Sequence, residues 1–373
     1  KYYIQEVEHK PGYLPNDEVY SFDASYTDQT LELLAFSEEI SNQPTITEFT
    51  KVDLTGGQEI EGAKMQILDQ DGKVVEEWVS KKEPHVVYAL EPGEYVLHEE
   101  QAPTEQGYVR AEDVKFVVEE TGDVQKVKME DDHTKVSISK TDITDGKEIE
   151  GAKLQILDQD GEVVESWTTG EEHLIEYLPV GTYTLHEEAA VDGYIVANDV
   201  EFTVEETGEI QKVKMEDERA MGQLVIVKTD ADSKAALEGV EFVLMEKETG
   251  KEVERLKTGK DGKAVSSLLP IGTYENGTFK EPITYVLKET AALEGYEKTE
   301  EEWEIVFSYQ NDKTPVIEVV KEIQNKKIPE APGTVKPGPK TGDDTNWFLP
   351  LLALGVSAGM VAGLLYYRKR HRK

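Results

Sequence analysis

Runs of alternating hydrophobic and polar residues recur along most of the chain, and one of them shows the pattern that the others follow. In GTYTLHEEAAVDGY, which starts at Gly181, the residues Tyr183, Leu185 and Glu187 share one face of the predicted strand, because successive side chains point to opposite faces. A carboxylate on an apolar face is costly unless it is protonated or paired. The pattern therefore predicts a β-strand in which Glu187 meets a partner inside the protein.

The same phrase is repeated along the chain, and repeats are best settled before other features are interpreted. It reads GEYVLHEEQAPTEQGY from Gly93, ITYVLKETAALEGY from Ile283 and YYIQEVEHKPGY from Tyr2. These repeats have the size of whole domains. We predict three complete units, at residues 45–133 (first unit), 134–219 (second unit) and 220–328 (third unit), preceded by the back half of another unit at 1–44 (the N-terminal fragment). A start inside a unit indicates a piece of a longer precursor.

Each complete unit opens with a strand that contains a lysine and continues into a hairpin. The opening strands read TEFTKVD, VSISKTD and LVIVKTD. Short alternating strands separated by Gly, Asp and Pro turns indicate an all-β fold of tandem antiparallel, Ig-like β-sandwiches. In the N-terminal fragment we expect strands at residues 2–6, 19–22 and 31–40.

The tetrapeptide DQDG occurs at residues 69–72 and 158–161, where calcium binding is one interpretation. It lacks the third acidic position and the distant Glu of an EF-hand loop. Because Asp and Gly in these places are typical of a hairpin turn, we predict turns instead.

Composition excludes several classes of function. The net charge of −37 makes nucleic acid an unsuitable partner, because phosphate binding needs clusters of Lys and Arg. The lack of cysteine excludes disulfides, thiol nucleophiles and thiolate metal sites. The sequence contains no recognisable catalytic triad, metal cluster or phosphate loop, so we expect no enzyme, no metal and no cofactor. The histidines show no metal-ligand spacing and are predicted to lie on the surface; they are residues 9, 85, 98, 133, 173, 186 and 371.

The C-terminal part has a different composition. Residues 329–346 are rich in Pro and Gly and are predicted to form an extended linker. Residues 347–367 are uncharged and would be about 31 Å long as a helix, enough to cross a bilayer. The basic tail RKRHRK follows at 368–373. Because positive residues stay on the cytoplasmic side, this pattern predicts a transmembrane helix with the acidic units outside.

Three polar side chains of each complete unit fall where the alternation calls for a hydrophobic residue. In the second unit they are Lys140, Glu187 and Asp217, one from each of three strands. The corresponding residues are Lys51, Glu99 and Asp131 in the first unit and Lys228, Glu289 and Asn325 in the third, and the N-terminal fragment retains Glu6 and Asn42, with its lysine partner expected upstream.

Burial of these side chains suggests a self-made amide bond. A buried lysine is more easily neutral and therefore nucleophilic, and a buried glutamate is more easily protonated. Such a glutamate can donate to the Asp or Asn carbonyl and shuttle protons. The alternative is a buried ion pair. Recurrence of the set in every complete unit favours the bond. The third unit also favours it, because Asn325 cannot form an ion pair with lysine.

Taken as a set, these motifs resemble a known family. KTD in the first strand, EGAK or EGVEF, Tyr-x-Leu-x-Glu followed by Gly-Tyr, and Asp or Asn in the last strand resemble the Cna-B or SpaA-like prealbumin-fold domains of Gram-positive surface proteins and pilins. The resemblance implies an Ig-like sandwich with an intramolecular isopeptide bond from Lys to Asp or Asn, assisted by Glu.

The C-terminus resembles a sortase sorting signal, with a PxTG motif before the apolar span and the basic tail. The motif residues are Pro339, Lys340, Thr341 and Gly342. By this resemblance, sortase would cleave after Thr341 and join it to a peptidoglycan or pilin amine. Gly338 stands where the common pattern has Leu, which leaves the sortase class open, and a plain membrane anchor is the alternative.

We therefore expect a stalk of cross-linked sandwiches, anchored by sortase to the cell wall of a Gram-positive bacterium, in adhesion or pilus structure. A host or extracellular-matrix ligand is a further class of partner. Two alternatives stay open. One is a pilus backbone subunit, although no YPK-type pilin motif is found. The other is the spacer of a surface enzyme or carbohydrate-binding protein whose active domain lies upstream.

Overall fold

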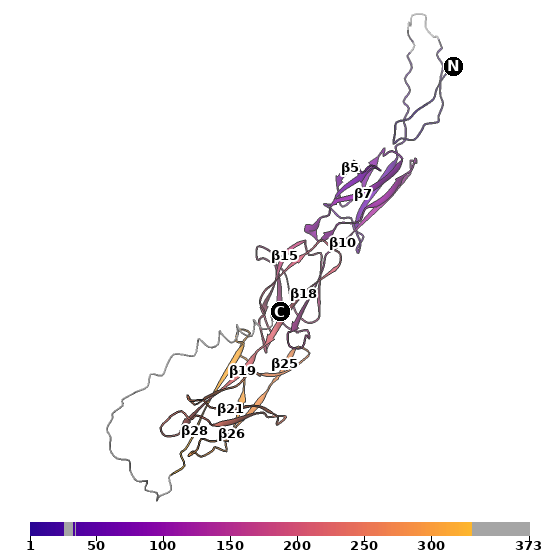
Figure 1. Cartoon of the computed structure of the whole chain (residues 1–373). Coiled ribbons are helices and arrows are strands. Elements are labelled where there is room, and N and C mark those ends of the chain that lie inside the picture. The colour runs from indigo at the N-terminus through magenta and orange to yellow at the C-terminus, as the bar shows by residue number, and fades with distance from the viewer. Residues whose placement is uncertain (26–32, 34, 330–373) are drawn as a thin grey trace, which may run out of the picture. The chain divides into compact units, whose positions relative to one another are not determined.

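The computed structural model describes residues 1–25, 33 and 35–329 (Figure 1). Residues Lys1–Lys327 form one compact part of the chain. The predicted transmembrane segment at 347–367, the basic tail at 368–373 and the sorting motif at 339–342 lie outside the described residues. Among the residues that are described, no helix is long and apolar enough to span a membrane.

The first unit is a sandwich of two four-stranded sheets. One sheet has the order β6-β3-β10-β8 and the other has the order β5-β4-β7-β9. A 3-10 helix, η1 (Thr104–Gln106), precedes β8. The strands are β3 (Ile46–Asp53), β4 (Lys64–Leu68), β5 (Val74–Val79), β6 (His85–Tyr88), β7 (Gly93–Gln101), β8 (Tyr108–Val109), β9 (Val114–Val118) and β10 (Val124–His133).

The second unit repeats this topology strand for strand. Its sheets have the orders β14-β11-β18-β16 and β13-β12-β15-β17. The strands are β11 (Lys135–Asp142), β12 (Lys153–Leu157), β13 (Val163–Thr168), β14 (His173–Glu176), β15 (Gly181–Ala189), β16 (Tyr194–Ile195), β17 (Val200–Val204) and β18 (Ile210–Arg219).

The third unit keeps the two sheets and adds a hairpin. One sheet contains β22-β19-β23 with β28 paired to β19, the other has the order β21-β20-β26-β27, and β24 pairs with β25. The strands are β19 (Met221–Asp230), β20 (Glu241–Glu246), β21 (Glu252–Lys257), β22 (Lys263–Val265), β23 (Leu269–Pro270), β24 (Gly272–Glu275), β25 (Thr278–Pro282), β26 (Thr284–Ala291), β27 (Glu302–Val306) and β28 (Val316–Asn325). The predicted all-β fold of tandem sandwiches is confirmed.

The prediction of purely antiparallel sheets is wrong for one pair of strands in each complete unit. The first and last strands run parallel: β3 with β10, β11 with β18 and β19 with β28. A parallel pair needs a long connection, and the strands between the first and the last provide it. Hydrophobic alternation has the same period in either direction, so it could not reveal the parallel pair.

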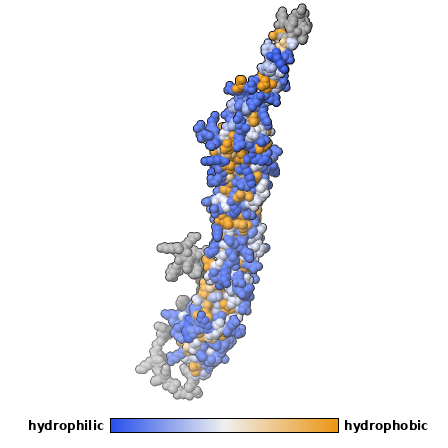
Figure 2. All heavy atoms as spheres, turned by 90° about the vertical axis from the view of Figure 1, so that its right-hand side faces the viewer, coloured by the Kyte–Doolittle hydropathy of each residue, from blue (hydrophilic) through white to orange (hydrophobic). Residues whose placement is uncertain are grey.

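Each unit has its own hydrophobic core between its two sheets. In β15 the alternation predicted from the sequence is realised, since Tyr183, Leu185 and Glu187 are all buried. Outside the cores, hydrophilic residues cover most of the face shown in Figure 2. In β15 the intervening residues Thr184, His186 and Glu188 are half-buried or exposed.

The DQDG segments form hairpin turns, as predicted. Asp69 Oδ1 accepts hydrogen bonds from the N–H groups of Asp71 and Lys73, at 3.0 and 2.9 Å, between the paired strands β4 and β5. Gly72 has a φ of +76°, which favours glycine. Asp158 and Gly161 repeat the arrangement between β12 and β13.

The N-terminal fragment contains less strand than expected. β1 (Tyr2–Ile4) pairs with β2 (Tyr20–Phe22), so the first strand ends before the expected residue 6. Residues 33 and 35–40 are not in a strand. Tyr2 and Tyr3 are 59% and 66% exposed, and a two-stranded pairing without a core to cover is only marginally stable.

Candidate functional site

In the second unit, three strands bring Lys140, Glu187 and Asp217 together. β11 and β18 are neighbours in one sheet, with Lys140 opposite Met215 and Asp142 opposite Asp217. β15 supplies Glu187 from the other sheet. Lys140 Nζ lies 2.9 Å from Glu187 Oε2 and contacts Asp217 Oδ1 directly. The three side chains are at most 1% exposed, so the cluster is screened from water.

The first unit has the same cluster in the same place. Lys51 on β3 lies between Glu99 on β7 and Asp131 on β10. Its Nζ is 2.9 Å from Glu99 Oε2 and contacts Asp131 Oδ1. All three residues are buried.

The third unit replaces the aspartate with an amide. Lys228 Nζ is 2.8 Å from Glu289 Oε2 and contacts Asn325 Oδ1. Asn325 Nδ2 donates to Glu289 Oε1 at 2.7 Å. Glu289 therefore contacts both the amine and the amide nitrogen.

The N-terminal fragment holds two of the three groups. Asn42 Nδ2 donates to Glu6 Oε1 at 2.7 Å, the same contact as between Asn325 and Glu289. Hydrogen bonds from the Asn16 N–H and from Asn42 lower the pKa of Glu6. Both Glu6 and Asn42 are half-buried, so this pair is more open to solvent than the clusters of the complete units.

Burial changes the protonation of these groups. It raises the pKa of Asp131 and of Asp217 to about 7, against the opposing charges of Lys51 and Lys140. The neighbouring Glu99 and Glu187 raise these pKa values further. Burial also lowers the pKa of Lys228. Low dielectric thus favours the neutral forms of Asp131, Asp217 and Lys228.

One atom of each carboxyl group in the Asp-containing clusters has no hydrogen-bond partner among the described residues. In the second unit these are Glu187 Oε1 and Asp217 Oδ2, and in the first unit they are Glu99 Oε1 and Asp131 Oδ2. The third unit has no such pair, because Asn325 Nδ2 carries hydrogens that reach Glu289. A single proton shared by the two carboxyl groups would satisfy both orphan oxygens of each Asp-containing cluster.

The family model described as "SpaA: Prealbumin-like fold domain" matches residues 45–133, 134–219 and 222–323. The chain belongs to this family. The resemblance to SpaA-like domains that the sequence motifs indicated is therefore confirmed.

Solved structures of similar proteins include the TIE protein and two major pilins. The Bacillus anthracis TIE protein is 28% identical with a TM-score of 0.52, over 76% of this chain and 51% of that chain. BcpA, the major pilin subunit of Bacillus cereus, is 16% identical with a TM-score of 0.43, over 76% and 99%. The full-length major pilin SpaD from Corynebacterium diphtheriae is 16% identical with a TM-score of 0.35, over 76% and 98%.

This chain thus spans about half of the length of the TIE structure. A search of curated proteins finds no match.

A second set of buried polar residues in these prealbumin-like units escaped the sequence analysis. Asp53, Asp142 and Asp230 each follow the cluster lysine by two residues and are at most 2% exposed. Asp142 Oδ2 accepts from the Tyr194 hydroxyl at 2.7 Å, and Asp230 Oδ2 accepts from the Tyr296 hydroxyl at 2.8 Å. The signal was present in the sequence, as Lys-x-Asp in the first strand and Gly-Tyr after the glutamate strand.

The prediction of surface histidines is wrong for His133, which is 2% exposed. Its ring stacks on Tyr177 with centroids 3.9 Å apart, and Nε2 lies 3.2 Å from Glu176 Oε1. Tyr177 and Glu176 belong to the second unit, whereas His133 is the last residue of the first unit. A junction between consecutive units buries this side chain, and local alternation carries no information about it.

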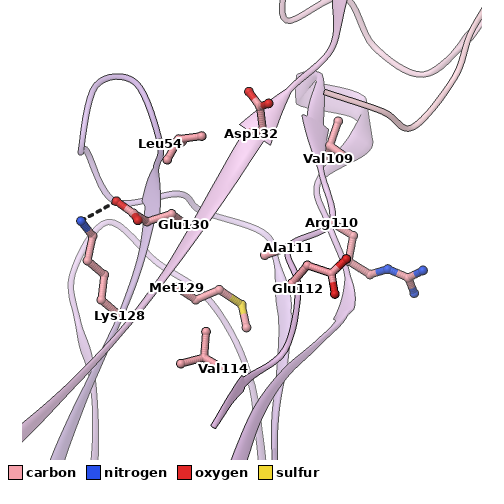
Figure 3. Close-up of a pocket in the computed structure, with 10 residues that line it drawn as sticks. All are labelled: Leu54, Val109, Arg110, Ala111, Glu112, Val114, Lys128, Met129, Glu130 and Asp132. Carbon is pink, nitrogen blue, oxygen red and sulfur yellow. Dashed lines mark ion pairs between the residues drawn. The ribbon is translucent and has the colours of Figure 1, made fainter. Parts of the chain in front are cut away.

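No other site in the described residues offers comparable chemistry. No group of three or more His, Asp or Glu side chains in this part of the chain could hold a metal ion. A hollow of about 400 Å³ lies at one edge of the first unit. In Figure 3, Met129 and Val114 lie between the Lys128–Glu130 ion pair on one side and Arg110 and Glu112 on the other. The cluster residues Lys51, Glu99 and Asp131 do not line the hollow.

Proposed function

We propose that each complete unit joins its lysine to the facing Asp or Asn through an intramolecular isopeptide bond, and that the units form a stalk on a bacterial surface. One observation carries this proposal. In all three units a lysine amine lies against the side-chain carbonyl of Asp or Asn, next to a glutamate, in a buried site.

In the second unit the reaction is a condensation. The reactive form has a neutral Lys140 amine and a proton on each carboxyl group, one that the pair already shares and one that the lysine ammonium gives up. Lys140 Nζ then attacks Cγ of Asp217, and an amine proton passes to Glu187 Oε2. The Oδ2 hydroxyl of Asp217 leaves as water with a proton from Glu187 Oε1, so the new C–N bond replaces the C–O bond and Glu187 ends with one proton, as it began. The fold contributes proximity, which for well-oriented groups is worth about 7–11 kcal/mol of barrier. The first unit would react in the same way.

In the third unit the leaving group is ammonia. Glu289 contacts Lys228 Nζ and Asn325 Nδ2 at 2.8 and 2.7 Å. It can therefore take a proton from the amine and return one to the departing nitrogen. The Cγ–Nδ2 bond of Asn325 breaks as the bond to Lys228 forms. Each of these reactions occurs once per molecule, and we propose no enzymatic turnover.

We further propose that the C-terminal segment anchors the stalk. Residues 347–367 would hold the precursor in the membrane until sortase cleaves after Thr341 and joins it to a peptidoglycan or pilin amine. The support is the order of PxTG motif, apolar span and basic tail. Adhesion is the function that best fits such a stalk, with a host or matrix ligand as partner.

Peptide mapping tests the cross-links unit by unit. A tryptic digest of the full chain should contain branched peptides that join residues 51 and 131, 140 and 217, and 228 and 325. Glu187→Gln should remove only the second-unit branch, because it changes the acid and leaves the other two clusters intact. Linear peptides alone from wild-type protein would contradict the proposal.

Cell fractionation tests the anchoring. Thr341→Ala should move the protein from the wall to the membrane fraction or the medium, whereas Thr334→Ala, a matched change in the same linker, should leave it in the wall. Equal wall attachment of both variants would argue against sortase. A ladder of covalent multimers, instead of single anchored chains, would favour the alternative of a pilus backbone subunit.

A further inference from the structure

Every complete unit holds a buried carboxylate that the proposed bond does not use. It is the aspartate two residues after the reactive lysine, and a tyrosine hydroxyl donates to it in each unit. The donors are Tyr194 to Asp142 and Tyr296 to Asp230. In the first unit Tyr177, from the following unit, donates to Asp53 at 2.8 Å, and Tyr108 of the Gly-Tyr pair further lowers the pKa of Asp53.

In the second unit this contact fixes the loop that follows the glutamate strand. Tyr194 is 0% exposed and sits in β16, directly after Gly193. Asp142 is tied at its other oxygen by the Thr144 N–H at 2.7 Å, and Arg219 Nε donates to Oδ2 at 2.6 Å. Burial alone would raise the pKa of Asp142, but these hydrogen bonds outweigh it and lower the pKa. The acceptor for Tyr194 is therefore a carboxylate held in place.

Three residues after the tyrosine, the same loop reaches the reactive cluster. The Ala197 N–H donates to Glu187 Oε2 at 2.6 Å. In the first unit, Ala111 stands at the same spacing from Tyr108, and its N–H donates to Glu99 Oε2 at 2.8 Å. Lysine also contacts this oxygen in both units. Oε2 is thus an acceptor from two donors, and Oε1 is left to carry a proton.

The third unit shows where this loop contact is not used. Glu289 Oε1 accepts from Asn325 Nδ2 and Oε2 accepts from Lys228. Among the hydrogen bonds of the described residues, none runs from a loop N–H to Glu289. Both oxygens of Glu289 therefore act as acceptors, and no oxygen has to be selected for a proton.

We propose that Tyr194 and Asp142 are positioning residues for the amide-forming reaction of the second unit. They hold the Ala197 N–H on Glu187 Oε2, so that the proton of the glutamic acid resides on Oε1, facing the leaving oxygen of Asp217. In the first unit the Ala111 N–H holds Glu99 Oε2 in the same way, and Asp53 accepts its tyrosine hydrogen bond from Tyr177. This inference rests on the proposed isopeptide chemistry and explains why units with Asp carry the loop contact and the unit with Asn does not.

Refolding of the full chain tests the proposal. Unlinked chain from inclusion bodies would be refolded, quenched at intervals and digested, so that mass spectrometry follows each branched peptide separately. Tyr194→Phe removes only the hydroxyl. The rate at 140–217 should fall roughly ten- to a hundredfold, because small misplacement of reacting groups has effects of that size. The branch at 228–325 serves as an internal standard in the same molecule.

A pH profile separates positioning from folding. Loss of the Ala197 N–H donor to Glu187 Oε2 raises the pKa of the carboxyl pair that Glu187 forms with Asp217. In Tyr194→Phe, the pH above which the second-unit rate falls relative to the third-unit rate should therefore move upward. If Tyr194 had a purely structural role, Tyr194→Phe would lower the yield of linked protein without moving the pH at which this rate ratio begins to fall.

Two further variants complete the test. Tyr296→Phe is the matched change in the third unit and should leave the 228–325 rate within about twofold of wild type, well inside one hydrogen bond's effect. Ala197→Pro removes the loop N–H directly. It should reproduce both the slower rate and the upward shift of the pH above which the second-unit rate falls. Wild-type rates and pH profile in either Tyr194→Phe or Ala197→Pro would overturn the inference, as would equal slowing by Tyr296→Phe. Absence of branched peptides from wild-type protein would instead contradict the isopeptide proposal itself.

Discussion

The clusters differ by a single heavy atom at the residue scale, and that atom changes how many protons each cluster needs. Asn325 Nδ2 brings its own hydrogens to Glu289. Asp131 Oδ2 and Asp217 Oδ2 are buried and have no hydrogen-bond partner within the described part of the chain, so the carboxyl pair must be protonated before its oxygen can leave as water. Burial provides for this by raising the pKa of Asp131 and Asp217 to about 7.

We expect this difference to appear as a pH dependence of bond formation. Both kinds of unit need a neutral lysine, but only the first and second need a protonated aspartate. Because a raised pKa means that the protonated form is lost as the pH rises through about 7, the second-unit rate relative to the third-unit rate should fall by about tenfold per pH unit above that value. Quenched refolding from pH 6 to pH 9 with peptide mapping measures this ratio.

Exchange of the leaving group provides the control. Asp217→Asn should give the second unit the pH dependence of the third and change its lost molecule from water to ammonia. The reciprocal Asn325→Asp should introduce the alkaline fall into the third unit. A constant ratio of the two rates between pH 6 and pH 9 in wild-type protein would show that aspartate protonation does not limit the reaction.

The parallel pairing of first and last strands is the decisive feature at the scale of elements. It places Lys140 two residue pairs from Asp217, since Lys140 lies opposite Met215. Lys228 and Asn325, which lie opposite Ile323 and Asp230, have the same offset. The glutamate comes from a strand of the facing sheet, which lies between the first and last strands in the sequence. In each unit the cluster therefore lies near the ends of the first and last strands, as Lys140 and Asp217 do in β11 and β18.

The sequence predicted the content of these clusters better than the connections between strands. Period-two alternation identified the inward faces, so a Lys, Glu or Asp on such a face could be recognised as buried. Strand direction was not predictable, because alternation is the same for parallel and antiparallel neighbours. The burial of His133 and Asp142 was missed for a related reason. Their partners Tyr177 and Tyr194 lie far away in the sequence, and local patterning does not report contacts between distant segments.

Close packing of the third unit gives a stability prediction for these elements. Gly222 lies in β19, where an added Cβ would be 2.2 Å from the ring of buried Phe307. Gly222→Ala should lower the free energy of unfolding of this unit by about 1–3 kcal/mol through overpacking. Hydrogen exchange of the β19 and β28 peptides measures the change. Gly170→Ala, where an added Cβ meets nothing within 4 Å, is the matched control, and equal exchange in the two variants would refute the packing argument.

At the scale of the whole molecule, three cross-links would lie one after another along the chain. Each would connect the first strand of a unit to its last, so that tension passes through the bond and leaves the intervening residues unloaded. By analogy with a disulfide that closes a loop of this size, each bond would add about 4–5 kcal/mol on the chain-entropy model. The benefit would be resistance to pulling and to proteases that cut open states.

Single-molecule pulling tests this mechanical role. Lys140 and Asp217 are 77 residues apart in sequence. Wild-type units should stay closed, whereas Glu187→Gln should add one unfolding step of about 26 nm, from roughly 3.4 Å per extended residue. The first and third units of the same variant serve as controls. A full-length unfolding step for each unit of wild-type protein would rule out a load-bearing bond.

The most direct measurement is the intact mass of the purified wild-type chain under denaturing conditions. Three completed bonds predict a mass below that of the plain polypeptide by two waters and one ammonia, the waters from the first and second units and the ammonia from the third. A mass equal to that of the unmodified sequence would mean that the three buried clusters are ion pairs and hydrogen bonds only, and it would contradict the account.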